Sequence, residues 1–411
     1  MIASNTLSLR HADELIALER TYGANNYDPL PVVLERGEGS WVVDVEGKRY
    51  LDMVGAYSAM SFGHCHPELV RAAKTQLDKL TLTSRAVYND QLPLFCRELA
   101  ALCGQDVVLP MNSGAEAVET AIKAARRWGY DDKGVPSGCA RIIAMANNFH
   151  GRTTTIVGMS TSPSAYEGYG PYAEGFDIVP FGDAEAVAEA IGDETVAVLV
   201  EPIQGEGGVV VPPKGYLRAL RDLCDQRRVL LLCDEIQTGL GRTGRVLDAH
   251  HDDVRADVTI LGKSLGGGLV PLSAAVGTSE VMGVFTPGTH GSTFGGNPLA
   301  AAIGRRAIGL LERTDLVERA RKLGAYLHDG LASIDSPFIA EVRGRGLLQA
   351  IELTEDAGPA RAVAEALLER GVLTKNAGRS VLRFAPPLVV RQSELDDALT
   401  HIDETLAGWA A

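Results

Sequence analysis

Short apolar runs separated by helical segments constrain the fold of this chain more than any other feature of its sequence. The runs at 141–146, 196–200, 229–233 and 258–261 have the length and apolar character of buried strands. Residues 217–226, between two of these runs, have a pattern typical of a helix. Because strands and helices alternate, the sequence predicts an α/β fold with a mainly parallel central sheet covered by helices on both faces.

The length of the chain predicts two unequal domains. One hydrophobic core rarely organises 411 residues, because cores stop growing at roughly 250–300 residues. We expect residues 53–300 to form a large domain, and a smaller α+β domain to combine an N-terminal segment, residues 1–52, with residues 301–411. In the C-terminal part, the pattern predicts a strand, a helix and a strand at 347–353, 360–370 and 381–384.

Composition and charge exclude several classes of protein. The formal net charge of −14 argues against general binding to nucleic acids or anionic membranes. Residues 1–15 contain no apolar core of signal-peptide length, and the apolar runs are too short to span a bilayer. The six cysteines show no spacing typical of a disulfide framework. We therefore expect a soluble, cytoplasmic protein with reduced thiols.

Three ionisable residues follow the predicted buried strands. Glu201, Asp234 and Lys263 lie where the runs at 196–200, 229–233 and 258–261 end, and ligands in open α/β sheets bind at the carboxyl ends of strands. This placement predicts a binding site that contains all three residues.

Lys263 stands between Gly262 and a glycine-rich segment at 266–268. An amine there can be desolvated, which lowers its pKa and permits Schiff-base formation. The alternative is an ordinary surface lysine in a flexible loop. A phosphate-binding loop of the Walker type is excluded, because Asp257 occupies the position where that motif needs its first glycine.

Asp234 ends an apolar run, where a carboxylate is costly unless it meets a cation. A protonated pyridine nitrogen is one such cation, and an acidic partner makes the ring an electron sink. A helix cap or a structural ion pair is the alternative, and the presence of Lys263 one strand later favours the cofactor.

Two glycine-containing segments are candidates for binding a phosphate. Ser113, Gly114 and Ala115 precede a predicted helix at 116–128, and the amides at a helix N-terminus suit an anion. An ordinary N-cap at Ser113 is the alternative, and both can hold together. The second candidate is the segment 291–297, which contains hydroxyl side chains.

Aromatic and basic side chains suggest further contacts with a ligand. Phe149 and His150 can stack on a flat ring, although core packing is the more common role, and Arg152 can hold a carboxylate with two hydrogen bonds. Arg383 lies in an apolar run and needs an anion. That anion is either a substrate carboxylate or an acid of the chain such as Glu206.

Three other patterns do not predict sites. The glycines at 239–244 match a dinucleotide motif by letter but open no helix. The segment 63–66 holds two histidines and a cysteine without a second pair of ligands at zinc spacing. His250 and His251 are more typical of a solvated pair than of metal ligands.

Longer motifs in this order resemble the class III, or ornithine/GABA-type, aminotransferases of pyridoxal-phosphate fold type I. They are VEPIQGE at 200–206, DEIQTG at 234–239, RTG at 242–244 and LGK at 261–263. The resemblance extends from about residue 27 to 390. Within the family, the chain is most similar to members that act on ornithine, through segments at 27–31, 63–67, 80–85, 127–130, 290–293 and 383–388.

The resemblance implies pyridoxal phosphate as cofactor, with Lys263 as the Schiff-base lysine and Asp234 as partner of the pyridine nitrogen. It also implies that Phe149 stacks on the ring and that Gln237 contacts its hydroxyl group. The implied cofactor-binding residues are Ser113, Gly114, Ala115, Phe149, Asp234, Ile236, Gln237, Lys263, Ser292 and Thr293. The last two would come from a neighbouring subunit, so the family pattern implies a homodimer with shared sites.

The resemblance also assigns substrate contacts. Tyr27 and Arg152 would bind the α-carboxylate of ornithine, and Tyr57 would shape a pocket that favours ornithine. Arg383 would bind the far carboxylate of 2-oxoglutarate, and Glu206 would mask Arg383 while ornithine is bound.

The implied reaction is a ping-pong transfer of the δ-amino group of ornithine to 2-oxoglutarate, with Lys263, Asp234 and Phe149 as catalytic residues. It would belong to arginine metabolism and proline biosynthesis. The alternatives are the same chemistry on acetylornithine or GABA, an isomerase or decarboxylase on the same fold, a cofactor-binding regulator without catalysis, and a dinucleotide oxidoreductase. One departure from the family is His150, where a tryptophan is expected.

Overall fold

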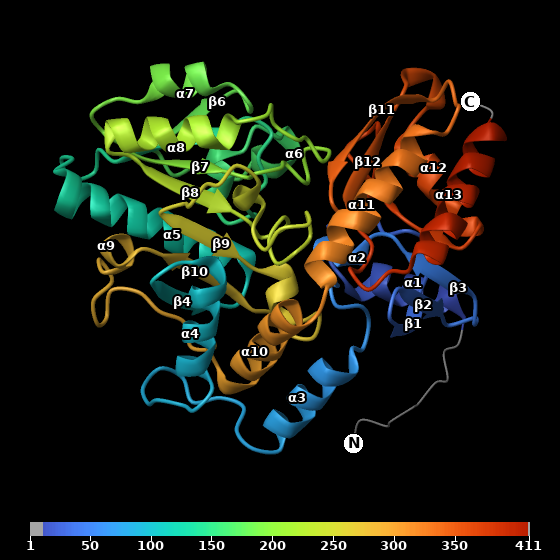
Figure 1. Ribbon diagram of the computed structural model, residues 1–411, viewed down its shortest axis with the longest axis horizontal. Coiled ribbons are helices and arrows are strands. Elements are labelled where there is room, and N and C mark those ends of the chain that lie inside the picture. The colour runs from blue at the N-terminus through green and yellow to red at the C-terminus, as the bar shows by residue number, and fades with distance from the viewer. Residues whose placement is uncertain (1–10, 410–411) are drawn as a thin grey trace.

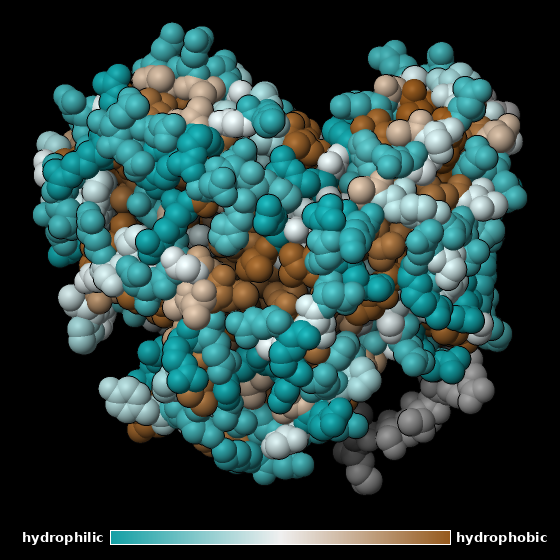
Figure 2. Space-filling view, in the orientation of Figure 1, coloured by the Kyte–Doolittle hydropathy of each residue, from teal (hydrophilic) through white to brown (hydrophobic). Residues whose placement is uncertain are grey.

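The computed structural model describes residues 11–409 and consists of a large and a small unit. Figure 1 shows the large unit with its sheet on the left. The small unit on the right combines the blue N-terminal strands with the orange and red C-terminal part of the chain. Figure 2 shows a notch between the two units and an apolar area near the centre of the same face.

A seven-stranded sheet forms the centre of the large unit, in the order β4-β10-β9-β8-β7-β5-β6. Strand β10 is antiparallel to both of its neighbours, and the pairs formed by β9, β8, β7, β5 and β6 are all parallel. The strands are β4 (Val107–Met111), β5 (Arg141–Met145), β6 (Phe176–Val179), β7 (Thr195–Val200), β8 (Leu230–Asp234), β9 (Val258–Leu261) and β10 (Ser273–Gly277).

Helices cover both faces of this sheet, as predicted. Leu230 and Leu232 pack in one core cluster with helix α5, whereas Leu231 and Cys233 pack in another with helix α8. Alternate residues of β8 therefore bury opposite faces, which explains why the run is apolar throughout. The helices of this unit are α3 (Pro67–Leu77), α4 (Leu92–Cys103), α5 (Gly114–Trp128), α6 (Pro163–Tyr166), α7 (Ala184–Ala190), α8 (Tyr216–Arg227), α9 (Ser279–Met282) and α10 (Pro298–Arg313).

The small unit holds two four-stranded sheets. In the first, strand β13 from the C-terminal part pairs in parallel with β3, so that Val372 lies opposite Leu51. The second is antiparallel, in the order β11-β12-β15-β14. The strands are β1 (Leu34–Glu38), β2 (Trp41–Asp44), β3 (Arg49–Asp52), β11 (Ile339–Arg345), β12 (Leu348–Leu353), β13 (Val372–Leu373), β14 (Lys375–Ala377) and β15 (Val381–Phe384). The helices are α1 (Ala12–Tyr22), α11 (Leu316–Ala332), α12 (Ala360–Glu369) and α13 (Gln392–Ala407).

Five short helical turns and one short helix complete the described chain. They are α2 (Gly55–Ser58), a π-helical turn (Gly129–Lys133) and 3₁₀ turns at Ile156–Met159, Asp248–His251, Lys263–Gly266 and Glu355–Ala357.

The predicted strands and helices agree with the structure, but three strands of the large sheet were not predicted. Strands β4, β6 and the reversed β10 lacked a recognised pattern. The domain boundaries at 52 and 300 stay a prediction, and the second of them falls inside α10. Within residues 11–409, no helix is both long and apolar enough to cross a bilayer.

Candidate active site

A cavity of about 200 Å³ lies where strands β7, β8 and β9 end. Its volume is below the roughly 300–1,000 Å³ typical of sites for drug-sized ligands, so it suits a small, flat molecule. Twelve residues line it: Gly114, Ala115, Phe149, His150, Gly151, Glu201, Ile203, Glu206, Asp234, Ile236, Gln237 and Lys263.

Lys263 begins the 3₁₀ turn that follows β9. Its backbone is left-handed, with φ of 44°, a strained conformation that is uncommon for side chains other than glycine and clusters at functional sites. Burial lowers the pKa of Lys263 to about 8, although the negative charge of Glu206 opposes the shift. An amine in this state is partly neutral near physiological pH and can act as a nucleophile or as a base.

Asp234 is the last residue of β8 and is buried. Its Oδ2 lies 2.7 Å from Nδ1 of His150, and its Oδ1 accepts a hydrogen bond from the amide of Ile236 at 3.1 Å. Burial opposes a charge on His150, but the hydrogen bond and charge of Asp234, with the charge of Glu201, outweigh it and raise the pKa of His150. The Nε2 atom of His150 is buried and has no partner within residues 11–409.

Glu201 follows β7 and is buried together with Asp234 and His150. Its Oε2 accepts a hydrogen bond from the amide of Phe149 at 3.0 Å. Burial raises the pKa of Glu201 to about 7, with His150 opposing the shift and Asp234 reinforcing it. The orientation of Phe149 and the charge of His150 therefore depend on the same carboxyl group.

Glu206 and Arg383 form an ion pair at another wall of the cavity. Nη1 of Arg383 donates to Oε1 of Glu206 at 2.6 Å and to the carbonyl of Gly205 at 3.3 Å. Burial would raise the pKa of Glu206, but the charges of Arg383 and Lys263 outweigh it and hold the pKa below its usual value. Both partners are therefore charged in this arrangement.

Gln237 presents an unpaired amide oxygen at this site. Its Nε2 donates to Glu206 at 3.3 Å, while its buried Oε1 has no partner among the described residues. A Cβ atom at Gly205 would lie 1.6 Å from that oxygen. Glycine at 205 therefore leaves room for the Gln237 amide.

Tyr57 is held by an unusual backbone. Residues Gly55, Ala56, Tyr57 and Ser58 all have φ between 45° and 75°, and each non-glycine residue there costs roughly 1–2 kcal/mol. A Cβ atom at Gly55 would lie 2.3 Å from the carbonyl oxygen of Ala385. This turn brings the ring of Tyr57 to 5.1 Å from Cζ of Arg383.

The start of helix α5 borders the cavity. Ser113 is the N-cap, and its side chain and that of Glu116 form a reciprocal capping box, so the N-cap interpretation is confirmed. Gly114 and Ala115 line the cavity, and a Cβ atom at Gly114 would meet Ile236 at 2.9 Å. The helix N-terminus thus faces the space with little side-chain bulk, as an anion site requires.

The predicted site residues fall into three groups. Those lining the cavity are Gly114, Ala115, Phe149, Glu206, Asp234, Ile236, Gln237 and Lys263. Arg383 and Tyr57 lie behind this lining. Arg383 contacts the lining residue Glu206, and Tyr57 in turn contacts Arg383. Outside the lining are Ser113, Ser292, Thr293, Tyr27 and Arg152.

The residues outside the lining are mostly exposed. Tyr27 is 65% exposed, and Arg152 is exposed with its guanidinium 5.5 Å from the ring centre of Phe149. Ser292 accepts a hydrogen bond from Nδ2 of Asn112 at 2.9 Å, next to the start of α5, and Thr293 is exposed.

Two cavity residues, Gly151 and Ile203, had no signal in the sequence, and two others, Glu201 and His150, were recognised there without the contacts that they make. Glu201 carries the same signal as Asp234, because it directly follows a buried apolar run. His150 was recognised as a stacking candidate, but its bond to Asp234 joins residues 84 positions apart and leaves no local pattern.

The glycine and histidine patterns set aside in the sequence lie in turns or make polar contacts within the chain. The glycines at 239–244 lie in turns and open no helix. Nε2 of His64 lies 2.8 Å from Asp52, and Nδ1 of His66 caps helix α3. Residues 11–409 contain no group of three or more histidine, cysteine or acidic side chains that could hold a metal ion.

The cavity fits pyridoxal phosphate. It offers a buried carboxylate for a pyridine nitrogen, an unpaired amide oxygen at Gln237, and a partly neutral lysine amine. An aromatic ring at Phe149 and the open N-terminus of α5 supply a stacking surface and a phosphate site.

Comparisons with known proteins agree with this chemistry. The family model Aminotransferase class-III matches residues 22–406. The ornithine aminotransferase of Bordetella pertussis is 54% identical over 390 residues, which cover 95% of each chain.

Solved structures are similar over nearly the whole chain. An ornithine aminotransferase from Toxoplasma gondii, with pyridoxal phosphate at partial occupancy in its active site, matches with a TM-score of 0.96 and 45% identity, covering 98% of this chain and 96% of that one. An acetylornithine aminotransferase from Elizabethkingia anophelis matches with a TM-score of 0.88 and 42% identity, covering 96% and 99% of the two chains.

Proposed function

This chain belongs to the class-III aminotransferase family, and from that premise we propose that it transfers the δ-amino group of L-ornithine to 2-oxoglutarate. The products are L-glutamate 5-semialdehyde and L-glutamate, and pyridoxal phosphate is the cofactor. The observation that carries the proposal is the ion pair between Glu206 and Arg383 at 2.6 Å, beside the Lys263 amine.

That ion pair answers a problem of charge. One site must receive the cationic amine end of ornithine and later a carboxylate of 2-oxoglutarate. With Glu206 on Arg383, the charge of Arg383 is neutralised and the cavity accepts ornithine. When Glu206 turns away, Arg383 is free to bind a carboxylate with two hydrogen bonds. An isomerase or decarboxylase has no second substrate and needs no such pair.

The cofactor-binding residues are assigned from their positions around the cavity. When bound, pyridoxal phosphate supplies an electrophilic carbon for the amine and a ring that accepts electrons. Lys263 would hold it through its amine, Asp234 would pair with the ring nitrogen, and Phe149 would stack on the ring. Gln237 would contact the ring hydroxyl, with Ile236 beside it, while Gly114 and Ala115 would hold the phosphate together with Ser113, the N-cap of α5.

Lys263 also moves the proton of the reaction. With the cofactor bound, the Nζ of Lys263 would be the group in the cavity that takes up and returns the proton of the reacting carbon. Its lowered pKa of about 8 suits this exchange near neutral pH. The buried carboxylate of Asp234, at the end of β8, would stabilise a positive charge on the ring nitrogen.

Tyr27 and Arg152 are assigned to the α-carboxylate of ornithine, and Tyr57 to the shape of the pocket. The support for Arg152 is its exposed guanidinium next to Phe149, which lines the cavity. The segment next to Tyr27 is held by Arg361, which donates hydrogen bonds to the carbonyl oxygens of Asp28 and Pro29 at 2.9 and 2.7 Å. These bonds fix the segment that carries Tyr27.

The active enzyme is a homodimer in this proposal. Ser292 and Thr293 lie outside the cavity of their own chain but carry the hydroxyl groups that a phosphate needs. A second copy would bring its Ser292 and Thr293 to the phosphate site. The acidic chain with free cysteines suits the cytoplasm, and the reaction suits arginine metabolism and proline biosynthesis.

The test is the visible spectrum of the purified protein with L-ornithine added and no keto acid. The cofactor's absorption band is expected to shift as the amine is taken up, and 2-oxoglutarate is expected to reverse the shift. Acetylornithine and GABA, run in parallel, are expected to leave the band nearly unchanged. A shift with acetylornithine instead would assign the chain to the alternative substrate, and a protein without such a band would contradict the proposal.

A further inference from the structure

A second cation stands beside Arg383. Strands β14 and β15 are antiparallel, and Lys375 lies directly opposite Arg383 in their register. Directly opposite residues project from the same face of a sheet and bring their Cβ atoms to roughly 4.5–5.5 Å. Both cations lie over the ring of Tyr57, with Cζ of Arg383 at 5.1 Å and Nζ of Lys375 at 5.8 Å from its centre.

This pair of like charges is unfavourable for the fold by itself. Like charges directly opposite each other destabilise a sheet. Glu206 neutralises Arg383 at 2.6 Å, but Lys375 makes no ion pair with any residue that the structure describes. Lys375 lies over the ring of Tyr57, and cation–π attraction is worth only about 0.5–2 kcal/mol.

Lys48 provides a comparison within the same small unit. Its amine also lies over a tyrosine, at 5.2 Å from the ring of Tyr50. However, Lys48 also donates to the carbonyl of Glu369 at 2.9 Å and lies 3.9 Å from its carboxylate. Lys48 is thus paired with an acidic residue, whereas Lys375 adds an unpaired positive charge next to Arg383 within the described residues.

We propose that Lys375 is a specificity-determining residue for the keto-acid half-reaction and holds the carboxylate of 2-oxoglutarate together with Arg383. The inference rests on the proposed two-substrate function. When Glu206 leaves Arg383, two uncompensated cations face one another across β14 and β15. A carboxylate relieves both charges at once, whereas ornithine presents only its amine end to this wall.

The consequence is an asymmetry between the half-reactions. Lys375 raises the affinity for the anionic substrate and adds nothing for ornithine. A residue that only supported the sheet would affect both half-reactions alike, because the sheet and Tyr57 serve both substrates.

The test compares Lys375→Met and Lys375→Arg with the control Lys48→Met, each as holoenzyme. In Lys375→Met, the KM for 2-oxoglutarate is expected to rise about tenfold, as for one lost charge-assisted contact. The ornithine half-reaction is expected to stay within about twofold, and Lys375→Arg to restore most of the affinity. Equal losses in both half-reactions, or no loss in either, would overturn the inference.

A binding measurement separates this inference from the proposed function. Glutarate is an unreactive dicarboxylate of the same chain length as 2-oxoglutarate, and its Kd by calorimetry needs no amine donor. It is expected to weaken about tenfold in Lys375→Met and to be unchanged in Lys48→Met. If that holds while ornithine fails to react with the wild-type protein, the proposed substrate is wrong and the role of Lys375 stands. If glutarate binds Lys375→Met and wild type equally, Lys375 has no such role even if ornithine reacts.

Discussion

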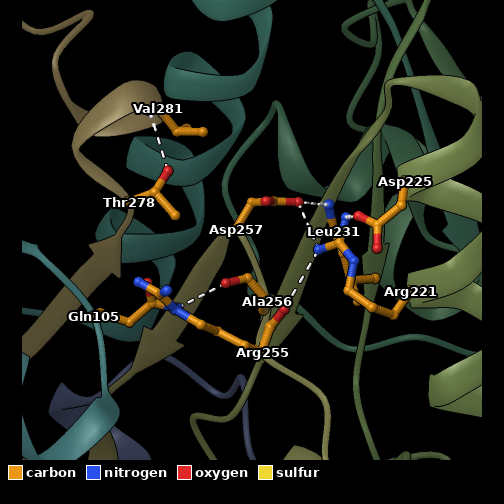
Figure 3. A network of polar contacts seen from close by, with 9 residues as sticks. All are labelled: Gln105, Arg221, Asp225, Leu231, Arg255, Ala256, Asp257, Thr278 and Val281. Carbon is orange, nitrogen blue, oxygen red and sulfur yellow. Dashed lines mark hydrogen bonds and ion pairs between the residues drawn. The ribbon is translucent and has the colours of Figure 1, made fainter.

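Charged side chains are buried at both ends of the central strands, but the two ends differ in how completely these side chains are hydrogen-bonded. At the amino ends of β8 and β9 (Figure 3), Oδ2 of Asp257 accepts hydrogen bonds from Arg221 at 2.8 Å and from the amide of Leu231 at 2.7 Å. Arg221 also pairs with Asp225 at 2.7 Å. Among the residues drawn there, only Nε of Arg221 is a buried side-chain atom without a partner.

The carboxyl ends of the same strands leave more polar atoms unpaired. Nε2 of His150, Oε1 of Gln237 and Nη2 of Arg383 are all buried without a partner in the described chain. Lys263 adds a left-handed backbone at the same place. Because buried polar groups are normally paired, unpaired atoms and strain together mark the end at which a ligand completes the structure, and the paired end serves the fold.

The largest expected effect is that of Lys263→Ala. The rate of ornithine transamination should fall by a factor of about 10³ or more, equivalent to about 4 kcal/mol, because the proton-transferring amine is lost. The melting temperature of the cofactor-free protein should not fall, since a desolvated amine is removed. Lys214→Ala, at an exposed lysine, is the control for both measurements. A Lys263→Ala protein that retains more than a tenth of the activity would show that the carboxyl ends of the strands do not hold the catalytic amine.

Asp257→Asn should give the opposite result. Arg221 would keep Asp225 but lose its more buried partner, so we expect the free energy of unfolding to drop by about 2 kcal/mol. The activity of the folded protein should stay within about twofold, because Asp257 lies at the far end of the strand. Denaturant titration checks the first expectation and steady-state kinetics the second. Asp225→Asn, at a mostly exposed carboxylate, should cost much less, and an equal cost would contradict the assignment.

The sequence predicts the end of the strands that holds the site better than it predicts the contacts made there. Asp234 and Lys263 can be predicted from the sequence because each follows an apolar run that the sheet buries on both faces. The run that forms β10 is Ser-Ala-Ala-Val-Gly, too weakly apolar to be recognised, so the reversed strand was missed.

Contacts between distant segments leave no such local signal. The bond from His150 to Asp234 and the opposition of Lys375 and Arg383 both depend on how elements pair in three dimensions. The left-handed turn at Tyr57 depends on the approach of Ala385 to Gly55. Family resemblance assigned Glu206 to Arg383, whereas the residues alone left that partner open.

Glu206→Gln should shift the balance between the two half-reactions. The substituted amide would keep the shape of the side chain but could not neutralise Arg383, so the wall of the cavity would carry a positive charge. We expect the kcat/KM for ornithine, divided by that for 2-oxoglutarate, to fall about tenfold, or about 1.4 kcal/mol. Single-turnover measurements of each half-reaction check this ratio. An unchanged ratio would mean that the ion pair between Glu206 and Arg383 only stabilises the fold, as the pairs at the amino ends of the strands do.

The smallest expected effect is a pH dependence of stability. Burial raises the pKa of Glu201 to about 7, so between its ordinary value near 4.5 and about 7 the folded protein binds a proton that the unfolded chain releases. The stability due to this carboxyl is therefore fully present below pH 4.5 and is lost as the pH rises through 7. Glu201→Gln stays neutral and avoids the loss, so its advantage over the wild type should grow by roughly 1 kcal/mol from pH 5 to 6.

Thermal unfolding of the cofactor-free proteins at several pH values measures this difference. Glu235, whose pKa burial also raises, titrates in both proteins and cancels in the comparison. His150 and Lys263 are also present in both proteins. A difference that is flat or shrinks with pH would show that Glu201 is charged in the fold, and that its partners satisfy it as fully as those of Asp257 do at the opposite end.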